Sequence, residues 1–266
     1  MMFSIKIEDH ELNGIRERFS RYVGGFYTGH EELDAAIRLK EDHTQRVVSE
    51  ILDIAGSSGF NEQQCHIAEI AALLHDIGRF PQYARYQTYV DAITENHALL
   101  GTRVILETGI LSGLAAHIQE LLVRVVEHHN RPEVPRQDDE DFILYLKLVR
   151  DADKLDIYRV ATDYYSGVET NEVIAIGLPD SPEVSDAVID SFVARRPVAY
   201  HELRSLNDFK VVQLGWVFDI NFVRTFELVK QRGYLKAIAR TLPPIPQIRQ
   251  VMKLTHAYVE QKCRRN

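Results

Sequence analysis

Histidine and aspartate side chains recur along the chain in an arrangement that suits a metal centre. The candidate segments are EDHTQRV with His43, LLHDIGR with the adjacent pair His75–Asp76, ENHALLG with His97, VEHHNRP with the pair His128–His129, and the acidic run DADKLD at 151–156. Imidazole nitrogens and carboxylate oxygens are ligands for zinc, manganese, iron and nickel, and one carboxylate can bridge two ions. These residue types therefore indicate a centre for divalent metal ions.

The adjacent residues His75 and Asp76 need a helix end if both are to point into one cleft. Neighbouring residues on an α-helix are separated by about 100° around its axis. The run before His75 is almost entirely small and apolar, which predicts a buried helix that is capped by Asn61 and ends at Gly78 and Pro81. At that end both side chains can turn towards ligands that converge from other helices.

Apolar residues recur at three- and four-residue spacing along most of the chain, which is typical of helices. The other expected helices are about 31–55, ended by Gly56–Gly59; one capped by Thr94 that runs through Ile105; Leu114 to His129; about Phe142 to Tyr165; one begun by Ser181–Pro182–Glu183; and a last one set off by Pro243, Pro244 and Pro246. We find no convincing alternating strand and no repeat. The predicted fold class is therefore all-α.

The composition limits the partners of the chain. Its 266 residues carry a formal net charge of -8, which disfavours a binder of nucleic-acid polymers or of anionic membranes because both would repel it. Cys65 and Cys263 stand far apart and indicate neither a disulfide framework nor a zinc–cysteine cluster. The first residues do not resemble a signal peptide, and the longest charge-free apolar stretch, 109–119, is too short to cross a bilayer. We expect a cytoplasmic location.

The order of these residues resembles the HD-domain superfamily of metal-dependent phosphohydrolases, over roughly residues 40 to 160. The resemblance implies that the metal ligands are His43, His75, Asp76 and Asp153. Asp151 is the alternative late aspartate, but Asp153 better matches the family pattern because it begins the run Asp-Lys-Leu-Asp. The implied architecture is an HD-domain-like helical bundle with additional C-terminal helices. We expect a single all-helical domain, with a catalytic core at about 30–165 and an extension at about 180–266.

The remaining histidines resemble those of the two-metal branch of the superfamily, which includes phosphodiesterases and cyclic-dinucleotide hydrolases. His97 and the pair His128–His129 would bind the second ion. It stays open whether one or both histidines of the pair are ligands. The Gly-Tyr-Pro signature of the cyclic-dinucleotide hydrolases is absent after this pair. The resemblance thus implies one or two divalent ions, drawn from iron, manganese, zinc, nickel and cobalt.

The implied reaction is hydrolysis of a phosphomonoester or phosphodiester, such as a nucleotide, by metal-activated water. Asp76 would bridge the ions, while Lys154 and Arg79 would hold non-bridging phosphoryl oxygens. The expected partner is a small phosphorylated substrate, and the oligomeric state stays open. Two alternatives remain: a catalytically silent HD-like module that binds a ligand or another protein, and a purely structural helical bundle.

Overall fold

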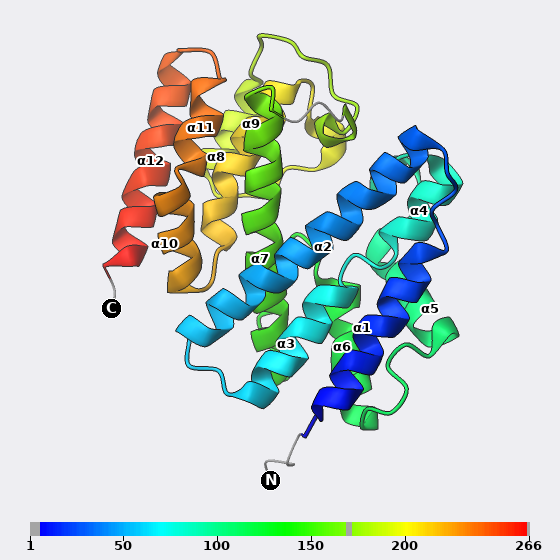
Figure 1. Cartoon of the computed structure of the whole chain (residues 1–266). Coiled ribbons are helices and arrows are strands. Elements are labelled where there is room, and N and C mark those ends of the chain that lie inside the picture. Colours follow the sequence, from blue (N-terminus) through cyan, green and yellow to red (C-terminus); the bar gives the residue numbers. More distant parts are fainter. Residues whose placement is uncertain (1–5, 169–171, 265–266) are drawn as a thin grey trace. The chain divides into compact units, whose positions relative to one another are not determined.

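The computed structural model describes residues 6–168 and 172–264, and within these ranges all regular structure is helical (Figure 1). The predicted all-α fold class is therefore confirmed. The chain divides into two compact units, Met1–Asp153 and Lys154–Asn266, with the division inside one long helix. All of the predicted metal ligands belong to the first unit.

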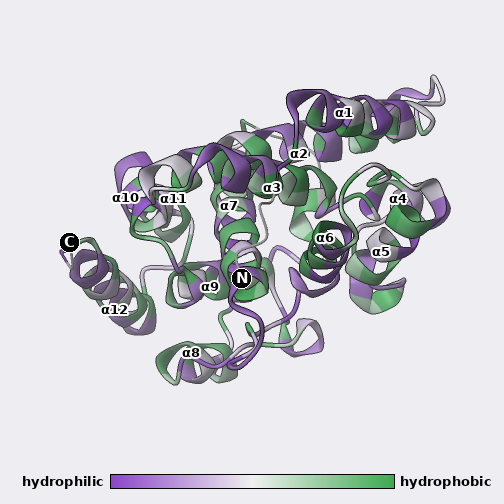
Figure 2. Ribbon diagram, turned by 90° about the horizontal axis from the view of Figure 1, so that it is seen from below, coloured by the Kyte–Doolittle hydropathy of each residue, from purple (hydrophilic) through white to green (hydrophobic). Residues whose placement is uncertain are grey.

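The first unit is a bundle of helices around α3. Its elements are α1 (Asp9–Gly24), α2 (Glu31–Ser57), α3 (Glu62–Leu74), α4 (Arg79–Tyr86), the 3₁₀ turn η1 (Asp91–Ile93), α5 (His97–Thr108), α6 (Ala116–His128) and the beginning of α7 (Glu140–Tyr165). Helix α3 packs along α2 and also contacts α1 and α6, while α4 contacts α2 and α5 (Figure 1). Figure 2 shows hydrophobic and hydrophilic residues alternating along α1, as expected for a helix with one buried face.

Helix α3 is central because its sequence allows burial on every side. From Ile67 to Leu74 each of its residues is buried, and all of them except Glu69 are apolar. The buried carboxylate of Glu69 accepts hydrogen bonds from the guanidinium of Arg16 on α1, at 2.6 Å from Nε. Asn61 caps the helix as predicted, with its side chain accepting from the backbone N–H of Gln64. His75 and Asp76 follow directly from this buried element.

Two predicted helix boundaries near the centre were wrong. Thr94 does not cap α5, because its hydroxyl donates to the carbonyl of Val90 in the preceding turn. The cap is Asn96, whose side chain accepts from the backbone N–H groups of the first turn. Pro81 does not end a helix either. It lies in the first turn of α4, where its missing N–H would have had no partner within the helix.

The second unit is formed by the end of α7 and the elements that follow it. These are η2 (Glu172–Ala175), α8 (Asp186–Val193), η3 (Tyr200–Glu202), α9 (Leu206–Gly215), η4 (Trp216–Asp219), α10 (Val223–Arg232), α11 (Tyr234–Arg240) and α12 (Pro246–Cys263). Helix α9 packs against α8, α11 and α12. The predicted helix start at Ser181–Pro182 was wrong, since Ser181 accepts a turn hydrogen bond from Glu183 and α8 begins only at Asp186. Pro246 does open the last helix, as its position after two other prolines predicted.

Within residues 6–168 and 172–264, no helix combines the length and the apolar character that a membrane span needs.

Candidate metal centre

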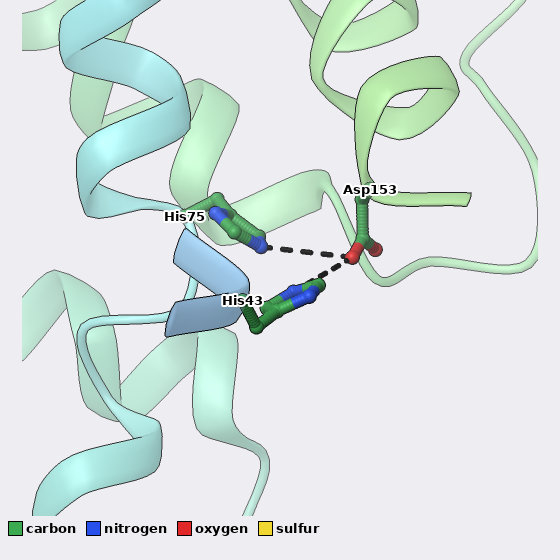
Figure 3. A group of neighbouring side chains, drawn as sticks. All are labelled: His43, His75 and Asp153. Carbon is green, nitrogen blue, oxygen red and sulfur yellow. Dashed lines mark ion pairs between the residues drawn. The ribbon is translucent and has the colours of Figure 1, made fainter. Parts of the chain in front are cut away.

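Three side chains from three different places in the first unit form a first group of possible ligands. His43 lies in the middle of α2, His75 follows the last residue of α3, and Asp153 lies on α7. Oδ1 of Asp153 is 3.2 Å from Nε2 of His43 and 3.7 Å from Nε2 of His75 (Figure 3). Their ligand atoms all lie close enough to one another to bind one ion.

A second group of possible ligands includes Asp76, the residue that follows His75. It consists of Asp76, of His97 at the first position of α5, and of His129 directly after α6. Oδ1 of Asp76 is 3.2 Å from Nε2 of His97 and 3.7 Å from Nε2 of His129. All three side chains are buried, as the core of such a site requires.

The carboxylate of Asp76 presents one oxygen to each group. Oδ1 faces the second group, whereas Oδ2 lies 3.5 Å from Nε2 of His43 and 3.8 Å from Nε2 of His75 in the first group. A carboxylate in this position can bridge two ions. His75 and Asp76 follow the end of α3, and both side chains are buried among the possible ligands.

Three of the candidate ligand imidazoles are held in one tautomer by the hydrogen bonds of their Nδ1 atoms. Nδ1 of His75 donates to the carbonyl of Ala72 at 2.7 Å, and Nδ1 of His129 donates to the carbonyl of Val126 at 2.7 Å. A carbonyl oxygen can only accept, so Nδ1 carries the proton and the neutral ring has its lone pair on Nε2. In His97, Nδ1 faces a carboxylate oxygen at 2.6 Å, which has the same consequence.

The orientation of these lone pairs fits bound cations. Nε2 of His97 and Nε2 of His129 lie 3.1 Å apart, so two nitrogen lone pairs face each other and require a positive charge between or beside them. Nε2 of His75 is buried and has no hydrogen-bond partner among the described residues, which is costly unless it coordinates an ion. The donor set of imidazoles and carboxylates is the one that zinc, manganese, iron, cobalt and nickel accept. The residues present therefore fit a metal centre.

The electrostatic environment keeps His97 and the two carboxylates in the forms that bind metal, whereas at His75 the adjacent carboxylates outweigh burial and raise the pKa of the imidazole. Burial and the neighbouring Arg79 lower the pKa of His97 to about 3, so its imidazole is neutral near pH 7. Burial would raise the pKa of Asp76, but Lys40 and other cationic neighbours outweigh it and hold that pKa well below its usual range. At Asp153 the adjacent imidazoles of His43 and His75 outweigh burial and hold the pKa of the carboxyl group well below its usual range. Ionised carboxylates and a neutral imidazole are the states that ligation requires.

Two residues that sequence reasoning missed support the second group. Asp91, in η1, accepts from Nδ1 of His97 and also from Arg79 at 2.8 Å. A carboxylate that orients a ligand histidine in this way fixes its ring and raises its basicity. Arg150, on α7, donates to the carbonyl of His129 at 2.9 Å and so holds the end of α6. No local pattern marks Asp91, whereas Arg150 lies about one helical turn before Asp153 and could have been found by that spacing.

Lys40 is the third missed residue. Its ammonium lies 2.8 Å from Oδ2 of Asp76, on the side of the first group. It precedes His43 by three residues on α2, so the two side chains share one face of the helix. That spacing was the signal available in the sequence.

Three predicted site residues have other partners in this structure. His128 lies outside both groups, with Nδ1 donating to the carbonyl of Arg124 and its ring packed edge-on against Phe142. Arg79 donates to Asp91 and to the carbonyl of Tyr89, at 2.8 and 2.6 Å. The ammonium of Lys154 pairs with Asp219 of the second unit at 2.7 Å. The phosphate contacts expected of Arg79 and Lys154 stay predictions.

Comparison with known proteins identifies the family. No curated protein and no solved structure matches the chain. The family model of the HD domain matches residues 41–158, a range that contains every possible ligand of both groups. The motif order, the helical fold and this match agree. Residues 41–158 therefore form an HD domain.

Proposed function

We propose that the chain is a phosphohydrolase with a binuclear metal centre that cleaves a small phosphomonoester or phosphodiester, a nucleotide among the candidates. The observation that carries this proposal is the position of Asp76, which turns Oδ2 towards the first group of ligands and Oδ1 towards the second. A centre for one ion would not need the buried second group. The two groups together favour two ions that share one carboxylate.

Each candidate ligand has a role in holding one or both ions. His43, His75 and Asp153 would hold one ion, His97 and His129 the other, and Asp76 both. Bound divalent ions lower the pKa of water towards neutrality and withdraw charge from phosphoryl oxygens. The chain itself fixes the ring orientations through the Nδ1 hydrogen bonds, and the burial of His75, Asp76, His97 and His129 limits their contact with bulk water. Preorganised charge of this kind supplies most of the rate enhancement in phosphoryl transfer.

The competing function is a catalytically silent HD-like module that binds a ligand or a protein. A module without catalytic activity is expected to have lost metal ligands or the groups that orient them by hydrogen bonds. Here the hydrogen bonds that orient His75, His97 and His129 are all in place. This completeness favours the enzyme.

Metal analysis followed by a substrate screen tests the proposal. Protein purified without chelator is expected to contain transition metal and to hydrolyse at least one member of a panel of phosphomonoesters, nucleotides and cyclic nucleotides. Asp76→Ala should abolish hydrolysis and most metal retention, because it removes the shared carboxylate. Asp42→Ala is the matched control, since Asp42 is exposed on α2 beside His43 and should leave both properties unchanged.

The outcomes separate the alternatives. Metal-free protein that takes up none of zinc, manganese, iron, cobalt and nickel refutes the proposal and leaves a structural bundle. Protein that binds metal but hydrolyses no member of the panel supports the silent module. Asp76→Ala protein that keeps wild-type metal content and turnover shows that the centre lies elsewhere.

A further inference from the structure

Lys40 is a partly buried cation beside the candidate metal centre. Its side chain is 17% exposed, and its ammonium lies 2.8 Å from Oδ2 of Asp76 and 5.4 Å from the centre of the Tyr89 ring. Asp76 is the carboxylate that the proposed function assigns to both metal ions. Lys40 therefore pairs with a carboxylate oxygen that would also coordinate a metal ion.

An ammonium and a divalent ion cannot share this oxygen favourably. Two positive charges within a few ångströms repel each other strongly in a partly buried site. The side chain of lysine is a flexible four-carbon stem with a compact charge at its end, so it can leave Asp76 without moving α2. On metal loading, Lys40 would lose the anion it pairs with and would remain beside the centre as a cation.

Arg79, the other cation beside Asp76, is less free to move. Its NH1 group donates to the carbonyl of Tyr89, to Asp91 and to Gln82, at 2.6, 2.8 and 2.9 Å. These contacts anchor the guanidinium to α4 and to the segment that orients His97. It is 3.4 Å from Oδ1 of Asp76, on the side of the second group. Lys40, in contrast, reaches the first group from α2, and among the described residues its ammonium contacts the Asp76 carboxylate and the Tyr89 ring.

We propose that Lys40 holds Asp76 in the metal-free protein and binds a phosphoryl oxygen of the substrate in the metal-loaded protein. This inference rests on the proposed function and deepens it, because it names a residue that recognises the phosphoryl group. It makes two predictions of opposite sign for the same substitution. Loss of the ammonium should tighten metal binding, since a competitor for Asp76 is gone, and should weaken phosphate binding, since a charged donor is gone.

Titrations with manganese and then with inorganic phosphate test this. Lys40→Met should bind manganese at least about threefold more tightly than wild type, the size expected for removing one competing ion pair. Manganese-loaded Lys40→Met should bind phosphate about tenfold more weakly, the loss expected for one charged hydrogen bond. Lys40→Arg keeps the charge and should stay close to wild type in both titrations. Lys253→Met, at an exposed position on α12, is the control for lysine removal.

Each outcome decides between the proposals. Unchanged phosphate affinity in Lys40→Met, or weakened binding of both manganese and phosphate, overturns the role of Lys40 while leaving the metal centre intact. Wild-type protein that binds no manganese or other transition metal overturns the proposed function itself, and this inference with it.

A second measurement uses the wild-type protein and does not depend on the folding of a variant. N-hydroxysuccinimidyl acetate modifies accessible lysines, and mass spectrometry reports the modification of Lys40. Lys40 should react slowly in metal-free protein, where it pairs with Asp76. It should react faster after manganese is added and slowly again when phosphate is also present. Equal reactivity in all three states contradicts the proposal.

Discussion

At the scale of single residues, the centre depends on the groups behind the ligands as much as on the ligands. His75 and His129 donate Nδ1–H to a backbone carbonyl three residues earlier, at the end of their own helices. His97 lies at the start of a helix and has no such carbonyl, so a side chain, Asp91, takes the same part. A backbone acceptor cannot be lost by substitution. Asp91 is therefore the outer partner that mutation can remove.

Substitution of Asp91 by Asn should weaken metal binding at the second group. The amide is neutral and also offers N–H donors, so it orients His97 less strictly and lowers the basicity of the ring. Loss of such an outer partner typically costs about 10–100-fold in metal affinity. Metal titration monitored by calorimetry measures the change. Asp138→Asn, which removes a carboxylate paired with Arg124 near the surface, should bind metal like wild type. Equal affinities for Asp91→Asn and wild type would remove Asp91 from the site.

The adjacent histidines of VEHHNRP provide a matched pair of variants. His129→Ala should lower the metal content from about two ions per chain to about one, because His129 belongs to the second group. His128→Ala should leave the content unchanged, since His128 packs on Phe142 and donates to the carbonyl of Arg124. Elemental analysis after dialysis gives the counts. The same content in both variants would show that the second group is not a metal site.

At the scale of elements, the end of the buried helix α3 must approach the start of α5 closely. Gly78 lies between α3 and α4, two residues after Asp76. A Cβ atom at this position would be 2.1 Å from the carbonyl oxygen of His97 and 2.5 Å from the backbone nitrogen of Gly101. Both neighbours are backbone atoms, so neither can rotate away. The close approach brings His97 within reach of Asp76.

Replacement of Gly78 by Ala should therefore push α5 away from His75 and Asp76. We expect a destabilisation of about 1–3 kcal/mol, as for other overpacked sites, and a metal content reduced towards one ion. Urea unfolding and elemental analysis measure the two effects. Gly56→Ala is the control, because no atom lies within 4 Å of its Cβ position near the end of α2. There alanine should be neutral or stabilise by up to about 1 kcal/mol. A Gly78→Ala protein as stable as Gly56→Ala would contradict the close contact.

At the scale of the whole molecule, the ligands of both groups all belong to the unit Met1–Asp153. They come from α2, the ends of α3 and α6, the start of α5, and α7. Bound metal would therefore connect segments that are far apart in the sequence. Bound metal should therefore stabilise this unit more than the second unit.

Removal of metal by a chelator should lower the thermal stability of the protein. An ion at about 100 times its dissociation constant stabilises the folded state by about 2.7 kcal/mol, or roughly 5–10 °C for a protein of this size. Amide hydrogen exchange should locate the loss of protection in α3, α5 and the end of α6, with much smaller changes in α10 and α12. Differential scanning calorimetry and exchange mass spectrometry measure these effects. Equal loss of protection in both units would argue against a centre confined to the first.

Much of this protein follows from local rules in its sequence. Helical periodicity predicted the all-α fold, and the cap at Asn61 and the proline at the start of α12 were correct because capping depends on a few neighbouring residues. The boundaries at Thr94 and Ser181 were wrong because several polar residues in these loops compete for the same role. The order of histidines and aspartates resembles that of the HD family, and the ligand types themselves indicated divalent metal ions.

Only the tertiary structure decided how these ligands divide and what orients them. Adjacent residues such as His128 and His129 differ by about 100° around the axis at a helix end, so their neighbours, and not their identity, determine which one faces Asp76. The contacts of Asp76 with Lys40 and of Asp91 with His97 join different elements. Such contacts depend on how α2, α3 and α5 pack, which no local pattern in the sequence records.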